Sequence, residues 1–159
     1  MSYEEGRAMA RELEAGTSGM AIGVPLLLLR LEGAGVFLAA LMLYASLDAS
    51  WWLFALLILA PDLGMLFYLA GRRAGASGYN ATHTYLAPLA LGAAAFHFAA
   101  PLGEAVAVIW AAHIGFDRAL GYGLKYPESF GRTHLGFSAR VRRLIRIQHA
   151  EPGMDRAAD

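Results

Sequence analysis

Four long apolar segments dominate this chain, and ionisable side chains interrupt them. A membrane-spanning helix needs about 20 mostly apolar residues, and each segment is long enough. A charged group inside a bilayer costs several kcal/mol unless it is paired, hydrated or bound to a metal. Ionisable residues in such segments are therefore candidates for function. Five of them fall inside the apolar runs: Glu32, Asp62, His83, His113 and Asp117.

The segments also predict the fold class. We expect an all-α, polytopic membrane protein whose four transmembrane helices form a bundle with short loops, as antiparallel neighbours do. The predicted helices cover residues 20–46, 51–71, 79–99 and 101–121, and together form one transmembrane domain over 20–121. The composition agrees, because only 16% of the residues are charged, against about 25% in soluble domains.

The remaining parts of the chain are polar. Residues 1–19 predict a cytoplasmic N-terminal segment, and residues 122–139 predict an ordered loop rich in glycine and aromatic residues. The sequence RVRRLIRIQH at 140–149 predicts a basic amphipathic helix on the membrane surface. Residues 122–149 would then form a cytoplasmic loop and surface helix, followed by a disordered tail at 150–159.

The positions of the basic residues predict the orientation, since Lys and Arg concentrate on the cytoplasmic side of a membrane. In a four-helix topology the basic residues of the loops fall on one side, and the loops at 47–50 and 100–103 carry none. We therefore expect a multi-pass membrane protein with both termini in the cytoplasm; a location in the bacterial inner membrane is what the resemblance described below implies. Zero formal net charge gives no bulk attraction to nucleic acid. The expected partners are membrane lipids, with a homo-oligomer as a further expectation.

His113 and Asp117 are the strongest chemical signal. They are four residues apart, which places both side chains on one helix face. An imidazole and a carboxylate in this arrangement suit a divalent metal. The alternative is a His–Asp hydrogen bond that only fastens the bundle.

Two other segments bring acids and histidines to a similar membrane depth, counted at about 1.5 Å per residue. Pro61 precedes Asp62 within the second segment, and a proline kink beside an acid predicts a polar cavity. Asp62 could instead pair with an arginine such as Arg30. His83 lies at the start of the third segment. The predicted metal ligands are Asp62, His83, His113 and Asp117, with zinc preferred and manganese or iron as alternatives. The absence of cysteine excludes a thiolate site.

Further polar residues could complete an active site. Glu32 or His134 could act as general base or acid, although His134 could equally be an ordinary surface histidine. Asn80 could contact a substrate or simply cap the third helix. An anionic substrate at the inner leaflet would meet basic residues near the cytoplasmic end of the bundle. The predicted substrate-binding residues are Asn80, Arg118, Lys125 and Arg132.

Several stretches resemble a bacterial membrane family of unknown function, domain-of-unknown-function family 4260. They are LLRLEG at 28–33, PDLGMLFYLAG at 61–71, YNATHTYLAPLAL at 79–91 and HIGFDRALGYGLKYPESFGRTHLG at 113–136. The order PD, TH and H-x-x-x-D, followed by glycine and proline, is also distantly similar to YdjM-like inner-membrane metal-dependent hydrolases. That likeness implies a metal-dependent hydrolase with Asp62, Thr82, His83, His113, Asp117, Gly121 and Pro127 at the matching positions. This chain has a single acid in the PD segment, which puts a second metal in doubt.

Four functions therefore compete. The first is an intramembrane metal-dependent hydrolase acting on a phospholipid or another anionic amphiphile. The second is a proton-coupled carrier, since buried acids and histidines also line transport paths. The third is a haem or quinone protein that uses His83 and His113, which their different estimated depths disfavour. The fourth is a structural membrane protein whose polar cluster only specifies packing.

Overall fold

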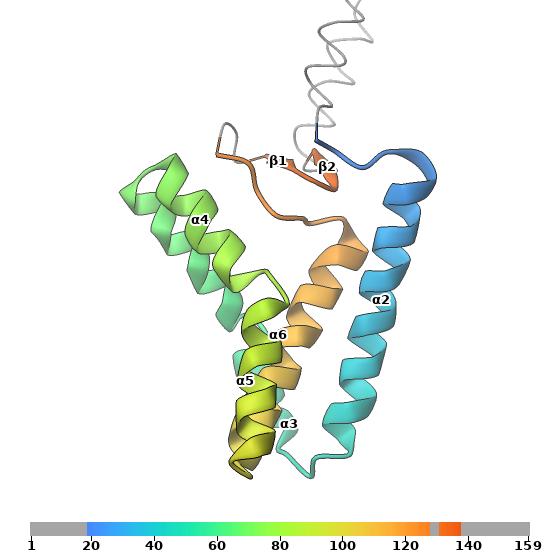
Figure 1. Cartoon of the computed structure of the whole chain (residues 1–159), viewed down its shortest axis with the longest axis vertical. Helices are drawn as coiled ribbons and strands as arrows, with labels where there is room; N and C mark the ends of the chain where they lie inside the picture. Colours follow the sequence, from blue (N-terminus) through green and yellow to red (C-terminus); the bar gives the residue numbers. More distant parts are fainter. Residues whose placement is uncertain (1–18, 128–130, 138–159) are drawn as a thin grey trace, which may run out of the picture.

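The computed structural model describes residues 19–127 and 131–137 (Figure 1). These residues are helical apart from loops and one pair of two-residue strands, so the all-α prediction is confirmed. The helices are α2 (Gly23–Ala45), α3 (Trp51–Leu57), the 3₁₀ helix η1 (Ala60–Ala70), α4 (Arg72–Thr82), α5 (Leu86–His97) and α6 (Pro101–Leu120). Strands β1 (Arg132–Thr133) and β2 (Gly136–Phe137) pair in antiparallel fashion after α6. The surface helix expected at 140–149, the tail at 150–159 and nearly all of segment 1–19 lie outside the described residues.

Two stretches are long and apolar enough to cross a membrane, Gly23–Ala45 and Trp51–Ala70. Only 11% of the apolar window in each is buried within the protein. Large apolar side chains therefore point outward, as Trp52 and Leu69 do with 85% and 89% of their surface exposed. Apolar surface of this extent marks contact with a membrane or with another protein.

Both middle helices are interrupted, which corrects their predicted boundaries. The expected helix at 51–71 ends as α3 at Leu57 and resumes as η1 at Ala60. Pro61 lies in the first turn of η1, where its missing N–H costs no helical hydrogen bond. The expected helix at 79–99 is wrong at its start, because α4 already begins at Arg72, and it is broken between α4 and α5. Gly71, with a φ of 107°, makes the turn between η1 and α4.

The helices α2 and α6 cross at two glycines. A Cβ added to Gly115 would lie 2.8 Å from the Phe37 nitrogen and 2.9 Å from the Gly33 carbonyl oxygen. The backbones are therefore in direct contact, as small residues permit between helices. Arg30 donates a hydrogen bond from Nε to the Ala119 carbonyl at 2.9 Å. A cation at this end of α6 complements the helix dipole. Arg30 therefore stabilises the C-terminal end of α6 and does not form the alternative pair with Asp62.

The pair η1 and α4 forms a helical hairpin that projects obliquely from the other helices (Figure 1). A 3₁₀ helix has three residues per turn, so Pro61, Gly64 and Phe67 share one face. This face packs on α4, where a Cβ on Gly64 would lie 3.1 Å from the Gly78 carbonyl oxygen. Asp62 belongs to the neighbouring face and is left free to turn toward α6.

Candidate metal centre

The break between α4 and α5 is held open by side chains of α6. His83 is the C-cap of α4, so the last carbonyls of that helix lack helical partners. Trp110 Nε1 donates to the Thr82 carbonyl at 2.7 Å, and Arg118 Nη2 donates to the His83 carbonyl at 3.1 Å. The break therefore has a fixed geometry, and it points the His83 side chain at α6.

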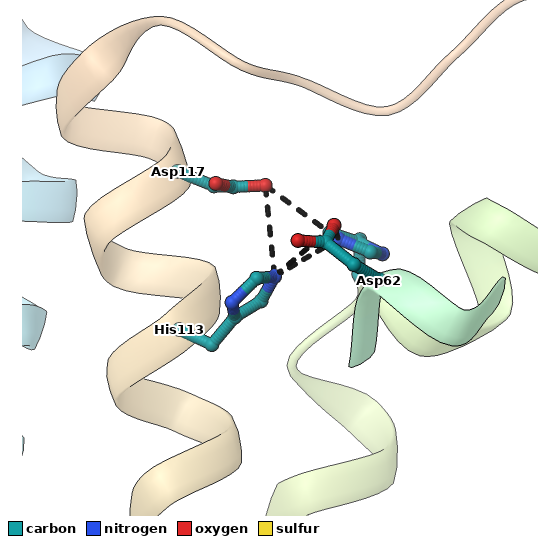
Figure 2. Close-up of side chains that lie close together, drawn as sticks. Asp62, His113 and Asp117 are labelled. Carbon is teal, nitrogen blue, oxygen red and sulfur yellow. Dashed lines mark hydrogen bonds and ion pairs between the residues drawn. The ribbon is translucent and has the colours of Figure 1, made fainter. Parts of the chain in front are cut away.

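Four potential ligands meet at this break. His113 and Asp117 project from successive turns of α6 toward Asp62 of η1 (Figure 2). His83 joins them, and one ligand atom from each of the four residues lies within 4.8 Å of every other. The convergence predicted from the sequence is confirmed, and this group could hold a metal ion.

The distances within the group match the size of a bound cation. His83 Nε2 lies 3.3 Å from Asp62 Oδ1 and 3.5 Å from Asp117 Oδ2. His113 Nε2 lies 3.7 Å and 3.8 Å from the same two oxygens, and 3.1 Å from His83 Nε2. Ligands at 2.0–2.2 Å from an ion in a tetrahedron are about 3.3–3.6 Å apart. The four donor atoms therefore lie close to the corners of a coordination shell.

Contacts outside the group orient its members. His83 Nδ1 lies 2.9 Å from the Tyr79 carbonyl oxygen, so an Nδ1–H donated there leaves the Nε2 lone pair facing the centre. The Tyr79 ring stacks on the His83 ring at 3.7 Å between centroids. Tyr79 also donates its hydroxyl to Asp117 Oδ2 at 3.3 Å. One residue thus positions a histidine and a carboxylate from two different helices.

The group is closed on one side and open on the other. His83 and His113 are each 2% exposed, whereas the Asp62 side chain is 33% exposed. Lys125 lies near this opening, with Nζ 4.3 Å from the centroid of the Tyr79 ring. Burial lowers the pKa of Lys125, and the negative charges of Asp62 and Asp117 partly oppose that shift. An anionic ligand that approached Asp62 would meet this ammonium group.

The other residues predicted to bind substrate have structural partners. Asn80 lies in the last turn of α4 and is not the predicted N-cap. Its amide accepts from the Lys125 N–H at 2.7 Å and donates to the Lys125 carbonyl at 2.9 Å, which fastens the loop after α6. Arg118 spans the helix break, and the Arg132 guanidinium lies 5.3 Å from the centroid of the Tyr126 ring.

Glu32 and His134, either of which was predicted as the general base or acid, are not members of the four-residue group. Both line a separate cavity of about 160 Å³ between α2, α6 and the loop that carries β1 and β2. Arg118 and Tyr85 also line it. The cavity shares none of its lining residues with the metal group.

Sequence reasoning missed Trp110 and Tyr79, which shape the centre without being ligands. Helical spacing could have found them, because Trp110, His113 and Asp117 share one face of α6 and Tyr79 is one turn before His83. The hypothesis that His83 and His113 are the two axial ligands of a haem does not fit the geometry. Nitrogens on opposite sides of one iron would be about 4 Å apart, whereas the two Nε2 atoms are 3.1 Å apart with carboxylates beside them.

Comparison with known proteins places the chain in a family. Residues 26–137 match the sequence profile described as Domain of unknown function (DUF4260). No curated protein matches the chain, and no solved structure does. The match covers more than half of the 159 residues and includes all four members of the metal group. The chain therefore belongs to the DUF4260 family.

Proposed function

We propose that this protein is a membrane-embedded, metal-dependent hydrolase that acts on a lipid-like or other anionic amphiphilic substrate. One observation carries the proposal. Two imidazoles and two carboxylates, from three helical elements, face one another at distances that suit a shared divalent ion. Nitrogen and oxygen ligands without thiolate favour zinc, manganese or iron.

The residues around the centre would have separate roles in hydrolysis: metal binding, substrate binding and the positioning of the ligands. A divalent ion held there would bring the pKa of a bound water toward neutrality. The two buried histidines fix the ion on the closed side, and Asp62 marks the side from which water and substrate enter. Lys125 would hold an anionic group of the substrate beside that entrance. Tyr79 keeps His83 and Asp117 in place.

A membrane location supports a lipid-like substrate. Two segments are long and apolar enough to span a bilayer, and their apolar side chains face outward. We propose that the interrupted pairs α3–η1 and α4–α5, together with α2 and α6, form the four transmembrane segments. The resemblance of the PD, TH and H-x-x-x-D order to YdjM-like metal-dependent hydrolases adds support, since these motifs supply the ligands.

Metal analysis of protein purified in mild detergent is the first test. We expect one zinc, manganese or iron ion per chain, and loss of that ion in His113→Ala. His97→Ala is the matched control, because His97 is an exposed histidine at the end of α5. Circular dichroism should show the same helicity in all three proteins. Wild-type protein that takes up none of the three metals on titration would contradict the proposal.

Hydrolysis is tested separately with metal-loaded protein and phospholipid vesicles. Mass spectrometry should detect hydrolysis products with wild-type protein and with Asp48→Asn, in which an exposed aspartate is changed. Asp62→Asn should yield none. If the metal binds but no product forms, and protons or metal ions cross the vesicle membrane instead, the carrier function is the better assignment.

A further inference from the structure

The cavity lined by Glu32 and His134 has the features of a second binding site. It lies on the side of α6 that faces α2, where the Cβ of Arg118 packs against Gly33. Its volume of about 160 Å³ is room for several water-sized groups. Leu29 and Val36 of α2 form an apolar wall. Glu32 belongs to the same helix, whereas Tyr85, Arg118 and His134 come from other parts of the chain. The cavity therefore combines polar groups with a surface suited to hydrocarbon.

Tyr85 is a further residue that lines this cavity. Its Oη is buried and makes no hydrogen bond within the part of the chain that the structure describes. Buried polar atoms without a partner are uncommon in proteins, because each carries an uncompensated loss of hydration. A ligand that accepts a hydrogen bond from Tyr85 would remove that cost.

Arg118 brings a positive charge to the cavity, and the carboxylate that stabilises this charge without a direct ion pair, Asp117, belongs to the metal group. Its guanidinium donates to the His83 carbonyl and lies beside the His134 ring. No carboxylate among residues 19–127 and 131–137 lies within ion-pair distance of it. A guanidinium removed from bulk water without an anion is costly. Its planar set of N–H donors matches phosphate and carboxylate oxygens.

His134 adds a second donor next to Arg118. The Leu124 N–H donates to His134 Nδ1 at 2.9 Å, so a neutral ring carries its proton on Nε2. Arg118 Nη1 lies 3.0 Å from that same Nε2. Nη1 also lies 3.3 Å from Nδ1, so the guanidinium lies over the imidazole ring and not in line with either nitrogen. An anionic oxygen beside the guanidinium can therefore also accept from the ring N–H.

We propose that this cavity binds a phosphate oxyanion through Arg118, His134 and Tyr85. The apolar wall fits the chain of an amphiphile whose phosphate head group enters the cavity, and free phosphate offers the same chemistry. Glu32 lines the cavity as an exposed carboxylate. Its negative charge weakens the binding of an anion and favours phosphate in a singly charged form. Its lining includes none of the four residues of the metal group, so binding can be measured in protein without the metal.

Phosphate binding is measured by calorimetry on chelator-treated protein in detergent, with His113→Ala as a background that carries no metal centre. Tyr85→Phe should weaken binding about tenfold while leaving the fold unchanged, because only an unpartnered hydroxyl is lost. Arg118→Lys should weaken it further, since lysine cannot reproduce the fork of donors. Glu32→Gln should strengthen binding. Tyr122→Phe, which changes an exposed tyrosine, is the matched control and should have no effect.

The source of the phosphate is settled by a second pair of probes. Micelles containing phosphatidic acid are compared with micelles containing diacylglycerol, which has the same chains and no phosphate. Retention of phosphatidic acid alone, with no uptake of free phosphate, assigns the site to a lipid head group. Uptake of free phosphate assigns it to the ion. The proposal is overturned if neither probe binds, or if Tyr85→Phe and Arg118→Lys bind as tightly as the wild-type protein does. Wild-type protein that binds phosphate but takes up no zinc, manganese or iron on titration would contradict only the hydrolase proposal.

Discussion

The two halves of α6 are built on different principles. In the first half, Ala105 and Ile109 pack against Tyr44 of α2 in an apolar cluster, and the Tyr44 ring meets Trp51 edge to face. From Trp110 onward, the side chains of Trp110 and Arg118 donate to main-chain carbonyls at the break between α4 and α5. Apolar packing holds the first half against its neighbours, and hydrogen bonds hold the second. One helix can therefore hold the bundle together at one end and present chemistry at the other.

If this division is correct, substitutions at the two ends should have separable effects. Changes in the apolar half should lower the stability of the whole protein without altering the metal site of the folded molecules. Changes in the polar half should alter metal affinity and leave most of the stability intact. The crossing of α2 and α6 involves Gly115, Arg118 and Ala119 of the polar half, and it should matter both to stability and to metal affinity.

The largest effect is expected at that crossing. Gly33→Leu would force a side chain into the Ala119 nitrogen and the Gly115 carbonyl, which lie 2.8 Å and 2.9 Å from a Cβ at this position. We expect a loss of about 3 kcal/mol or more, with little folded protein recovered. Gly35→Leu is the control, because a Cβ there meets nothing within 4 Å. Thermal unfolding in detergent measures both. Equal stabilities would show that the helices do not cross at Gly33.

A smaller loss of stability is expected from Ile109→Ala. Ile109 is 1% exposed, so its truncation leaves a cavity beside Tyr44 and should cost about 2 kcal/mol. Zinc affinity measured on the folded fraction should stay unchanged. Leu102→Ala, on the exposed side of the same helix, should cost little. A drop in zinc affinity with Ile109→Ala would mean that the two halves of α6 are not independent.

In the polar half, Trp110→Phe removes the donor to the Thr82 carbonyl. The break between α4 and α5 should then loosen and let His83 shift. Groups that orient ligands typically change metal affinity about tenfold or more, and we expect zinc affinity to fall by about that factor. Trp52→Phe changes an exposed tryptophan and is the control. Competition with a zinc-binding dye gives both affinities, and identical values would remove the role assigned to Trp110.

The smallest effect concerns pH and the loop after α6. Burial and the nearby Arg118 lower the pKa of His134, and the other charged group lining its cavity is Glu32. Because the unfolded pKa is about 6.5, the folded state binds the proton more weakly. The contribution of His134 is therefore complete above about pH 6.5 and is lost as pH falls toward the lower folded pKa.

Amide hydrogen exchange at Leu124 and in β1–β2 should detect this change. Protection, corrected for the intrinsic rate, should fall slightly between neutral and mildly acidic solution. His134→Gln cannot titrate and should show no such fall. Protection that falls equally in the variant would assign the pH effect to another group.

The metal group was predictable from the sequence, and much of its support was not. Helical spacing fixes His113 and Asp117 relative to each other. Estimated membrane depth, the proline before Asp62 and the order of the PD, TH and H-x-x-x-D motifs together predict that Asp62 and His83 lie beside them. Hydropathy does not reveal a helix break inside a continuous apolar run, so the separation of α4 from α5 was missed. The break depends on partners in α6 that are distant in sequence.

Asn80 illustrates the same limit. Its position near an apolar run suggested a helix cap or a substrate contact, but both ends of its amide bond to the backbone of Lys125. No local pattern reveals a partner 45 residues away. The crossing at Gly33 and Gly115 was also missed. A glycine within an apolar helix does not indicate a helix contact unless the position of the neighbouring helix is known.

Arg118 touches both the helix break and the loop that carries His134. A phosphate that drew its guanidinium away from the His83 carbonyl would change the support of a metal ligand. Thermodynamic linkage makes such an influence mutual, so an anion that altered the affinity for zinc would have its own affinity altered by zinc to the same degree. Through the single side chain of Arg118, phosphate bound in the cavity would then change the zinc affinity of the metal group.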